Sequence, residues 1–303
     1  MTDAERRGLI DAIERVIQQD VGRNIAPLFG PCAGGLYGAA AAIAARPRPV
    51  LGLITGFYVP LGDPPAAETD GPVGAALLAA GLSAVGLGCR IATDSVCAGA
   101  CAAALRGAAV TDVPVDAASP GEDMGALADR WTAAGVTTAV AIERCGPARD
   151  GVPRNMRGLN MSAWNAPLHA LFDAGPWGTV AIGDGGNEIG MGSVPHALIA
   201  RHIDNGTAIA CATPAQHLIV AGVSNWGCYA LIGALAVLRA DWRVGLLGVL
   251  DEKLDAAILE AMVRDGPAVD GLTRLRALTV DGLEPAVHHA RIREIRGLVE
   301  GSR

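Results

Sequence analysis

The sequence predicts an α/β fold in which a mostly parallel sheet carries helices on both faces, a Rossmann-like three-layer sandwich. Short apolar runs alternate with Ala-rich helical segments over residues 50–240, and each apolar run ends in glycines or polar residues. Repetition of strand, loop and helix places the strands parallel. Apolar residues make up 51% of the 303 residues, a share that suits a sheet buried on both faces. We expect one domain over residues 1–303.

The expected elements begin with a helical segment over residues 1–45. Residues 3–20 carry apolar residues at helical spacing, and the Gly/Ala-rich residues 30–45 form a loop that runs into a tightly packed helix. We then predict strands at 50–54, 89–92, 137–142, 179–182 and 207–211. The helices predicted among them cover 72–82, 96–106 and 123–134. Residues 264–282 are turn-rich with room for one short strand, and the last helix covers about residues 283–299.

Residues 218–238 form an uncharged stretch that is long enough to span a bilayer. The tetrapeptide Ser224-Asn225-Trp226-Gly227 divides it into a strand-like part over 218–220 and a helix-like part over 229–239. A buried strand, a polar loop and a buried helix therefore explain this stretch better than a membrane span.

Charge and residue usage exclude several function classes. The formal net charge is −7 and no basic stripe occurs, so we expect neither nucleic acid nor a membrane as a partner. Lys253 is the only lysine, which argues against a P-loop and against a pyridoxal-phosphate imine. The seven cysteines lie in apolar sequence, as reduced thiols do. With no signal-peptide pattern, we expect a cytoplasmic protein. Its expected partner is a small molecule, and a homo-oligomer is open to it.

The most informative segment is Ile182-Gly183-Asp184-Gly185-Gly186-Asn187-Glu188-Ile189-Gly190-Met191-Gly192. It follows a predicted strand and leads into a helical segment over 194–203, so its polar groups lie at the carboxyl edge of the sheet, where ligands bind. Glycines let the backbone approach a ligand, and the N–H groups of a new helix face an anion. Asp184, Asn187 and Glu188 add acceptors, donors and proton transfer within one turn. A helix cap in a tight turn is the simpler interpretation, but three polar side chains among five glycines favour a site.

Three further polar clusters follow other predicted strands. One comprises residues 55–56 and 68–71, the second comprises residues 143–144 and 155–158, and the third comprises residues 224–226. Since the carboxyl ends of parallel strands share one side of a sheet, we expect these clusters to converge on one pocket. Arg157 suits a substrate carboxylate, which a guanidinium binds with two hydrogen bonds; a solvated surface arginine is the alternative. The expected substrate-binding residues are Thr55, Gly56, Glu68, Thr69, Asp70, Asn155, Arg157, Gly185, Gly186, Ser224 and Asn225.

With these clusters, the chain resembles the glutamate-cyclase domain found at the C-terminus of D-glutamate cyclases and as a stand-alone bacterial protein. The residues that carry the resemblance are Thr55-Gly56-Phe57, Glu68-Thr69-Asp70-Gly71-Pro72, Ile142-Glu143-Arg144, Asn155-Met156-Arg157-Gly158, Ile182 to Gly192 and His217 to Gly227. The resemblance implies a carbon–oxygen hydro-lyase that converts D-glutamate to 5-oxo-D-proline and water. Mammalian members carry an additional N-terminal domain, so the resemblance leaves open whether this chain is catalytically complete.

The residue inventory suits that reaction. Ring closure needs a base for the ammonium proton, fixed donors for the negative charge that develops, and an acid for the departing oxygen. We hypothesise that Glu188 or Asp184 is the base, that backbone N–H groups of residues 185–187 are the donors, and that Arg157 clamps the α-carboxylate. This chemistry requires no cofactor.

Two alternatives stay open. A non-catalytic amino-acid- or nucleotide-binding protein on the same fold would bind a ligand without turnover. A metal-dependent hydrolase would use Asp184 and Glu188 to hold Mg²⁺ or Mn²⁺, and sensitivity to chelators would reveal it.

Overall fold

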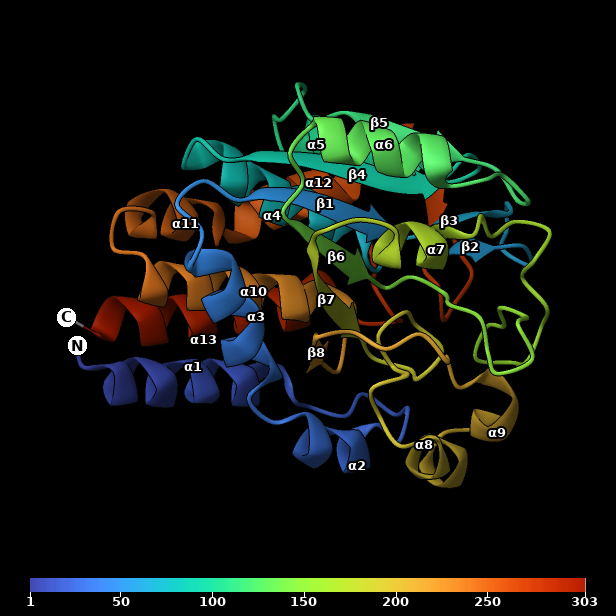
Figure 1. Cartoon of the computed structure of the whole chain (residues 1–303), viewed down its shortest axis with the longest axis horizontal. Coiled ribbons are helices and arrows are strands. Elements are labelled where there is room, and N and C mark those ends of the chain that lie inside the picture. Colours follow the sequence, from blue (N-terminus) through green and yellow to red (C-terminus); the bar gives the residue numbers. More distant parts are fainter. Residues whose placement is uncertain (303) are drawn as a thin grey trace.

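Six parallel strands form the main sheet of the computed structural model, which describes residues 1–302 (Figure 1). The strands are β1 (Val50–Thr55), β4 (Gly88–Asp94), β5 (Val115–Ala118), β6 (Thr138–Ile142), β7 (Gly178–Gly183) and β8 (His217–Val220). They lie in the order β5-β4-β1-β6-β7-β8, and every neighbouring pair is parallel. Counted within this sheet, the order is 3-2-1-4-5-6, that of the Rossmann fold. Chain direction across the sheet reverses between β1 and β6, and ligands bind outside the carboxyl ends of the strands at such a point.

Helices cover both faces of this sheet, so the predicted three-layer α/β architecture is confirmed. On one face the buried core joins α1 (Asp3–Ile17), α3 (Gly35–Ala44), α4 (Pro72–Ala84), α5 (Ala98–Gly107), α10 (Ser224–Leu238), α11 (Arg243–Val249), α12 (Glu252–Asp265) and α13 (Pro285–Gly301). On the other face it joins α2 (Ala26–Phe29), α6 (Gly125–Ala133), α7 (Leu168–Asp173) and α8 (His196–His202). Alternate residues of β6 face the two cores, Val140 and Ile142 the first and Ala139 and Ala141 the second.

A second, three-stranded sheet lies beyond the carboxyl edge of the main one. It consists of β2 (Tyr58–Val59), β3 (Ala66–Glu68) and β9 (Ala268–Val269), with β2 antiparallel and β9 parallel to β3. In Figure 1 the arrowheads of the main sheet point toward this side and away from the two termini. The small sheet therefore brings a C-terminal segment next to the long connection between β1 and α4.

The strands predicted from sequence at 50–54, 89–92, 137–142, 179–182 and 218–220 are confirmed. The strand predicted at 207–211 is wrong, because those residues belong largely to the short helix α9 (Gly206–Ile209). The short apolar run there fits a helical turn as well as a strand. The edge strand β5 was not predicted, since its sequence Val-Asp-Ala-Ala has no continuous apolar run.

Two helix starts differ from expectation. The predicted polar loop at 224–227 is the first turn of α10, which begins at Ser224. The helix predicted over residues 194–203 is confirmed as α8, but residues 184–195 before it form turns and isolated bridges, so no helix starts beside Asp184. That second difference removes the expected row of free helix N–H groups beside Asp184.

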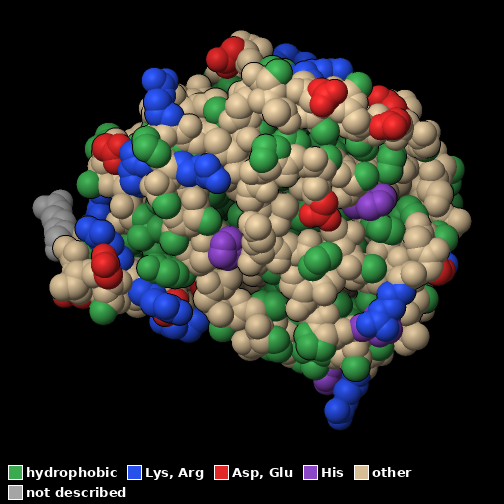
Figure 2. All heavy atoms as spheres, in the orientation of Figure 1, with side chains coloured by type: hydrophobic (Ala, Val, Ile, Leu, Met, Phe, Trp, Pro, Cys, Tyr) green, Lys and Arg blue, Asp and Glu red, His purple; other side chains and the backbone are tan. Residues whose placement is uncertain are grey.

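No single helix among residues 1–302 has the length and apolar character of a membrane span. Residues 26–44 are long and apolar enough only when α2, the 3₁₀ turn η1 (Gly30–Cys32) and α3 are taken together, and the chain bends by 47° between η1 and α3. All seven cysteines are free thiols, and all but the half-buried Cys32 are buried, which confirms the predicted absence of a disulfide framework. On the face shown in Figure 2, basic side chains lie in separate groups among apolar and acidic ones.

Gly52 of β1 generates a prediction about the core between the sheet and α6. An added Cβ would lie 2.0 Å from Cζ3 of Trp131, a fully buried ring whose Nε1 donates to Asp116 at 3.1 Å. Because Trp131 is held in place, Gly52→Ala should lower the free energy of unfolding by about 1–3 kcal/mol in urea denaturation. Gly297→Ala on exposed α13, with nothing within 4 Å, should instead be neutral or stabilise by about 0.5–1 kcal/mol. Wild-type stability of Gly52→Ala would contradict this packing.

Candidate active site

A cavity of about 310 Å³ opens at the carboxyl edge of the main sheet. Apolar and aromatic side chains form part of its wall, among them Phe57, Tyr58 and Leu272. Its acidic and basic lining side chains are Arg23, Glu68, Glu143, Arg157, Asp184, Asp204 and Asp281. The cavity is thus partly apolar, with a concentration of acids, as small-molecule sites are.

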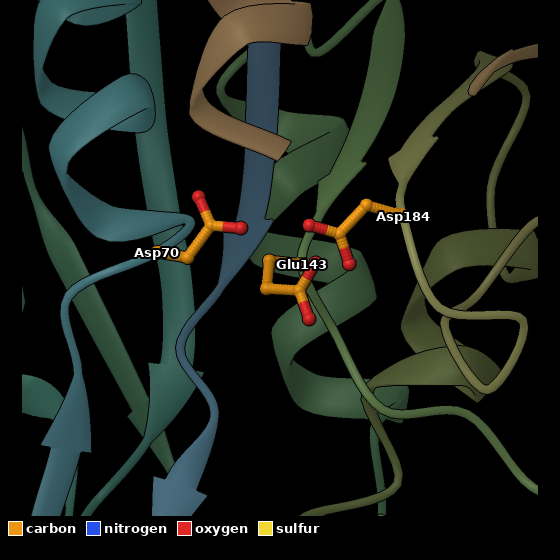
Figure 3. A group of neighbouring side chains, drawn as sticks. All are labelled: Asp70, Glu143 and Asp184. Carbon is orange, nitrogen blue, oxygen red and sulfur yellow. The ribbon is translucent and has the colours of Figure 1, made fainter. Parts of the chain in front are cut away.

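Three buried carboxyl groups point toward one another beside this cavity (Figure 3). Asp70 precedes α4, Glu143 follows β6 and Asp184 follows β7. One oxygen of each lies within 4.8 Å of one oxygen of each of the others. The parallel sheet explains the convergence, because β6 and β7 end side by side at the edge that α4 and α10 also reach.

The first turn of α10 organises this acid triad. The Ser224 N–H donates to Asp70 Oδ2 at 3.0 Å and lies 3.1 Å from Asp184 Oδ2, and the Asn225 N–H donates to Asp70 Oδ1 at 2.8 Å. The Ser224 hydroxyl donates to Glu143 Oε2 at 2.6 Å. Unpaired N–H groups at a helix start stabilise negative charge, so α10 supports the acids that it orients.

Asn225 connects the starts of two helices. Its Oδ1 accepts the N–H groups of Gly71 at 3.0 Å and Gly74 at 2.7 Å, and its Nδ2 donates to Thr69 O at 3.3 Å. The Thr69 hydroxyl in turn donates to Thr279 O at 2.9 Å. Asn225 and Thr69 were expected to bind substrate, but their polar groups are used within the protein and neither residue lines the cavity.

Glu143 is held in a strained conformation by its neighbour Arg144. The φ angle of Glu143 is 43°, in the left-handed region that costs a non-glycine residue about 1–2 kcal/mol. The fully buried Arg144 guanidinium donates to Gly56 O, Asp94 Oδ1 and Ala166 O, each at 2.9 Å. This anchor fixes the end of β6, and the strained residue beside it directs its carboxyl group into the cavity.

Residues from both ends of the chain complete the site. Arg23, in the loop between α1 and α2, forms ion pairs with Asp184 and with Asp281, which lies just before α13. Glu68, at the end of β3, also faces the cavity, and its Oε1 has no hydrogen-bond partner among the described residues. Sequence reasoning missed Arg23 and Asp281, and it noted Glu143 only as part of a polar cluster.

Glu68, Asp70, Glu143, Asp184 and Asp281 form what we name the acid cluster, five buried carboxyl groups around one guanidinium. Burial raises the pKa of Asp184 and of Asp281 to about 6, against the lowering effect of Arg23. Burial and the neighbouring acids raise the pKa of the other three well above the ordinary range. The acid cluster therefore retains protons at neutral pH or takes up a cation.

The glycine-rich loop after β7 is organised by the side chain of Glu188. The Glu188 carboxylate accepts the N–H of Gly186 at 2.7 Å and lies 3.3 Å from the N atom of Asp184, so it shapes the turn. Glu188 does not line the cavity and is not part of the triad that could hold a metal. Asn187 does line it, with Nδ2 donating to Arg154 O at 2.9 Å and Oδ1 unpartnered.

The remaining predicted residues divide into cavity-lining and supporting ones. Asn155 and Arg157 line the cavity; Asn155 Oδ1 accepts the Arg157 N–H at 3.0 Å, and the Arg157 side chain is exposed. Thr55 is fully buried with an unpartnered hydroxyl, and Gly56, at a φ of 99°, leaves room for the Thr93 side chain. Residues that do not line the cavity are Thr55, Gly56, Thr69, Asp70, Gly185, Gly186, Glu188, Ser224 and Asn225.

Fold and site together define an α/β protein of Rossmann strand order with an acid-lined small-molecule cavity at the carboxyl edge of its sheet. A family model described as D-glutamate cyclase-like, C-terminal, matches residues 13–296. The chain is 33% identical over 292 residues to the human protein named D-glutamate cyclase, mitochondrial, an alignment that covers 82% of this chain and 45% of that protein. The chain therefore belongs to the D-glutamate cyclase-like family, and it spans less than half the length of this relative.

Asp281 yields a prediction about stability and pH. Its pKa of about 6 in the fold exceeds the ordinary 3.8, so its contribution to stability is present at low pH and lost as pH rises through about 6. Relative to wild type, Asp281→Asn should therefore gain about 3 kcal/mol of unfolding free energy between pH of about 4 and about 7. Denaturant titrations across this range measure the difference.

Asp116→Asn is the matched control. Burial raises the pKa of Asp116, but hydrogen bonds from Arg90, Arg130 and Trp131 outweigh it and leave the pKa lowered. The ionised Asp116 carboxylate therefore stabilises the fold above its pKa, and this stabilisation is lost as pH falls. Asp116→Asn lacks it, so the variant should become less stable than wild type as pH rises from the acid end. An unchanged pH dependence in Asp281→Asn would contradict the raised pKa.

Proposed function

We propose that this chain catalyses the intramolecular dehydration of D-glutamate to 5-oxo-D-proline. The observation that carries the proposal is the acid cluster around Arg23, in a cavity of a chain that belongs to the D-glutamate cyclase-like family. The human relative bears the name of this activity, but the alignment covers only 45% of its length. The activity of this chain is therefore a proposal to be tested on the chain itself.

The substrate's charges match the cavity. An α-ammonium group is attracted to the acid cluster, which has more carboxyl groups than cations. A γ-carboxyl group that enters the same acidic surroundings is kept from ionising, which makes it a better electrophile. Arg157, an exposed guanidinium of the lining, suits the α-carboxylate. Both reacting ends are then held together, which is a large part of catalysis in a ring closure.

The reaction forms one N–C bond and breaks one C–O bond. The γ-carboxylate takes up one proton when it binds in its neutral form, so its departing hydroxyl needs one more. The ammonium nitrogen loses two protons: one joins the departing hydroxyl, which leaves as water, and the other replaces the proton taken up on binding, so no proton is gained or lost overall. We propose Glu68 as the residue that moves these protons, since Glu68 lines the cavity and its buried Oε1 has no hydrogen-bond partner among the described residues. Gly271 packs against its other oxygen, where an added Cβ would lie 2.2 Å from Oε2. We therefore propose for Glu68 the proton-transfer role for which the sequence suggested Glu188 or Asp184.

We further propose that Asp70, Glu143 and Asp184 hold a divalent cation of the Mg²⁺ or Mn²⁺ type. Carboxylate oxygens are the ligands that these ions prefer, and the three groups converge within 4.8 Å. The excess of buried acids over guanidinium groups also favours a bound cation. When bound, the cation would offset that charge and polarise a substrate oxygen.

The test is to incubate purified chain with D- and L-glutamate and to quantify 5-oxoproline by chiral chromatography. We expect product from D-glutamate above the uncatalysed rate. Glu68→Gln, which keeps the side-chain shape, should lower kcat by about a hundredfold or more because it cannot transfer protons. Glu300→Gln, at an exposed ion pair on α13, should match wild type.

Binding of D-glutamate without turnover would contradict the proposed activity and favour the non-catalytic binding protein. Wild-type kcat in Glu68→Gln would place proton transfer elsewhere in the acid cluster. Gel filtration and cell fractionation test the separate expectations of a homo-oligomer and of a cytoplasmic location.

Chelation tests the proposed cation. Dialysis against EDTA should lower turnover, and Mn²⁺ or Mg²⁺ should restore it. Calorimetric titration of the metal-free chain with Mn²⁺ should show binding that Glu143→Gln weakens. Full turnover after chelation, together with no binding of Mn²⁺, would contradict the proposed cation. Bound protons alone would then neutralise the buried carboxylates.

A further inference from the structure

The proposed reaction needs a fixed hydrogen-bond donor for the oxygen that becomes negative during ring closure. The backbone N–H groups of residues 185–187 were expected to serve, but Gly186 donates to Glu188 Oε2 at 2.7 Å and no helix begins there. Arg157 is exposed, and it is already proposed to bind the substrate's α-carboxylate, which is not the reacting group. Among the other cavity-lining residues that the structure describes, Arg23 carries the remaining guanidinium.

We propose that Arg23 is a further catalytic residue, whose guanidinium binds the substrate's γ-carboxyl group and stabilises the oxyanion, with Asp281 as its positioning residue. This inference rests on the proposed cyclisation. Arg23 transfers no proton in it and contributes hydrogen bonds and positive charge alone. The amine nitrogen attacks the γ-carbon, the C–O bond breaks, and one proton from nitrogen passes to the departing hydroxyl, which leaves as water.

The exposure of Arg23 supports this role. Its side chain is 22% exposed and reaches the cavity surface, whereas the Asp184 and Asp281 side chains that it contacts are 1% and 3% exposed. A guanidinium has five N–H donors, so two ion pairs leave donors free. Arg23 Nη1, although it contacts Asp184, is buried without a hydrogen bond of acceptable geometry to any described residue. The two carboxylates therefore do not use all the donors of the guanidinium, and a substrate oxygen can reach the exposed part of this side chain in the cavity wall.

Arg23 is also fixed at both ends, as an oxyanion-stabilising group must be. In its own loop, Asp20 Oδ1 accepts the N–H groups of Gly22 at 2.8 Å and Arg23 at 2.9 Å. At the head of the side chain, Nη2 donates to Asp281 Oδ1. The Asp281 segment is itself anchored, because Asp270 Oδ2 accepts the N–H of Gly282 at 2.7 Å. A donor that is already held in position needs little reorganisation energy during the reaction.

The experiment compares Arg23→Ala and Arg23→Lys with wild type under the same assay conditions, with Mn²⁺ present. Arg23→Ala should lower kcat by about 10²–10³-fold, and millimolar guanidinium should restore part of it. Arg23→Lys keeps the charge and the fold but loses the planar fork, so kcat should fall by about tenfold or more. Arg90→Ala is the matched control, since Arg90 forms an ion pair with Asp116 at the β4–β5 side of the sheet. It should keep wild-type kcat and show no response to guanidinium.

Asp281→Asn tests the positioning role. It should lower kcat more than it changes KM, and its folded content by circular dichroism should match that of wild type. Wild-type kcat in Arg23→Lys, or a loss in Arg23→Ala that guanidinium leaves unchanged while the variant is folded, would overturn the inference. If Arg23→Ala does not fold, the Arg23→Lys result alone decides.

Glutarate, which has the two carboxylates but no amine, separates this inference from the proposed function. Its binding, measured by calorimetry, should weaken about tenfold or more in Arg23→Ala. A wild-type chain that binds glutarate through Arg23 but forms no 5-oxoproline would refute the cyclase activity and retain Arg23 as a carboxylate-binding residue. A wild-type chain that turns over D-glutamate while the Arg23 variants keep kcat and glutarate affinity would refute only the role of Arg23.

Discussion

The structure depends on one electrostatic constraint, the burial of five carboxyl groups around a single guanidinium at the edge of the main sheet. An ionised carboxylate that leaves water costs several kcal/mol after relaxation, so five of them together cannot stay fully charged. The fold compensates in three ways. Helix α10 supplies N–H donors to Asp70 and Asp184, Arg23 supplies a positive charge, and protons or a cation supply the rest.

This constraint explains why distant parts of the chain meet at the site. The Rossmann strand order brings the ends of β6 and β7 together, and the first turn of α10 lies against them. That arrangement explains why the acidic side chains converge, but it does not supply the positive charge that offsets theirs. The counter-charge comes from the N-terminal loop through Arg23, and the C-terminal segment holds Arg23 through Asp281. The two ends of the chain are thus part of the site's chemistry as well as of the α1–α10–α13 layer.

The sequence predicted the main sheet well because its longer strands are continuous apolar runs that end in glycine or polar residues. The short strands β2, β3, β5 and β9 have two to four residues each, too few for a periodic signal to separate strand from loop, and only the one in the turn-rich segment near the C-terminus was expected. The helix predicted over 194–203 is present, but Glu188 accepts the N–H of Gly186 within the preceding loop and residues 184–195 are non-helical, so the helix N–H groups expected beside Asp184 are not there.

Site residues that stand in the polar clusters after predicted strands, such as Asp184 and Glu68, were predicted, and those outside these clusters were missed. Asp184 could be found because strand ends in a parallel sheet carry ligand-binding groups. Arg23 and Asp281 lie 258 residues apart in loops that follow no strand of the main sheet, so no local pattern joins them. The sequence did not show that the Glu143 side chain points into the cavity. That direction depends on the positive φ of Glu143, which the pair Glu143-Arg144 does not reveal.

Infrared spectroscopy of the metal-free protein near neutral pH tests the central claim most directly. If the acid cluster cannot carry its full negative charge, the spectrum contains the carbonyl band of buried protonated carboxyl groups. Substitution of a cluster acid by its amide should reduce that band, and added Mn²⁺ should reduce it with release of protons to the solvent. A metal-free spectrum without protonated carboxyl groups, and without proton release on adding Mn²⁺, would contradict the account.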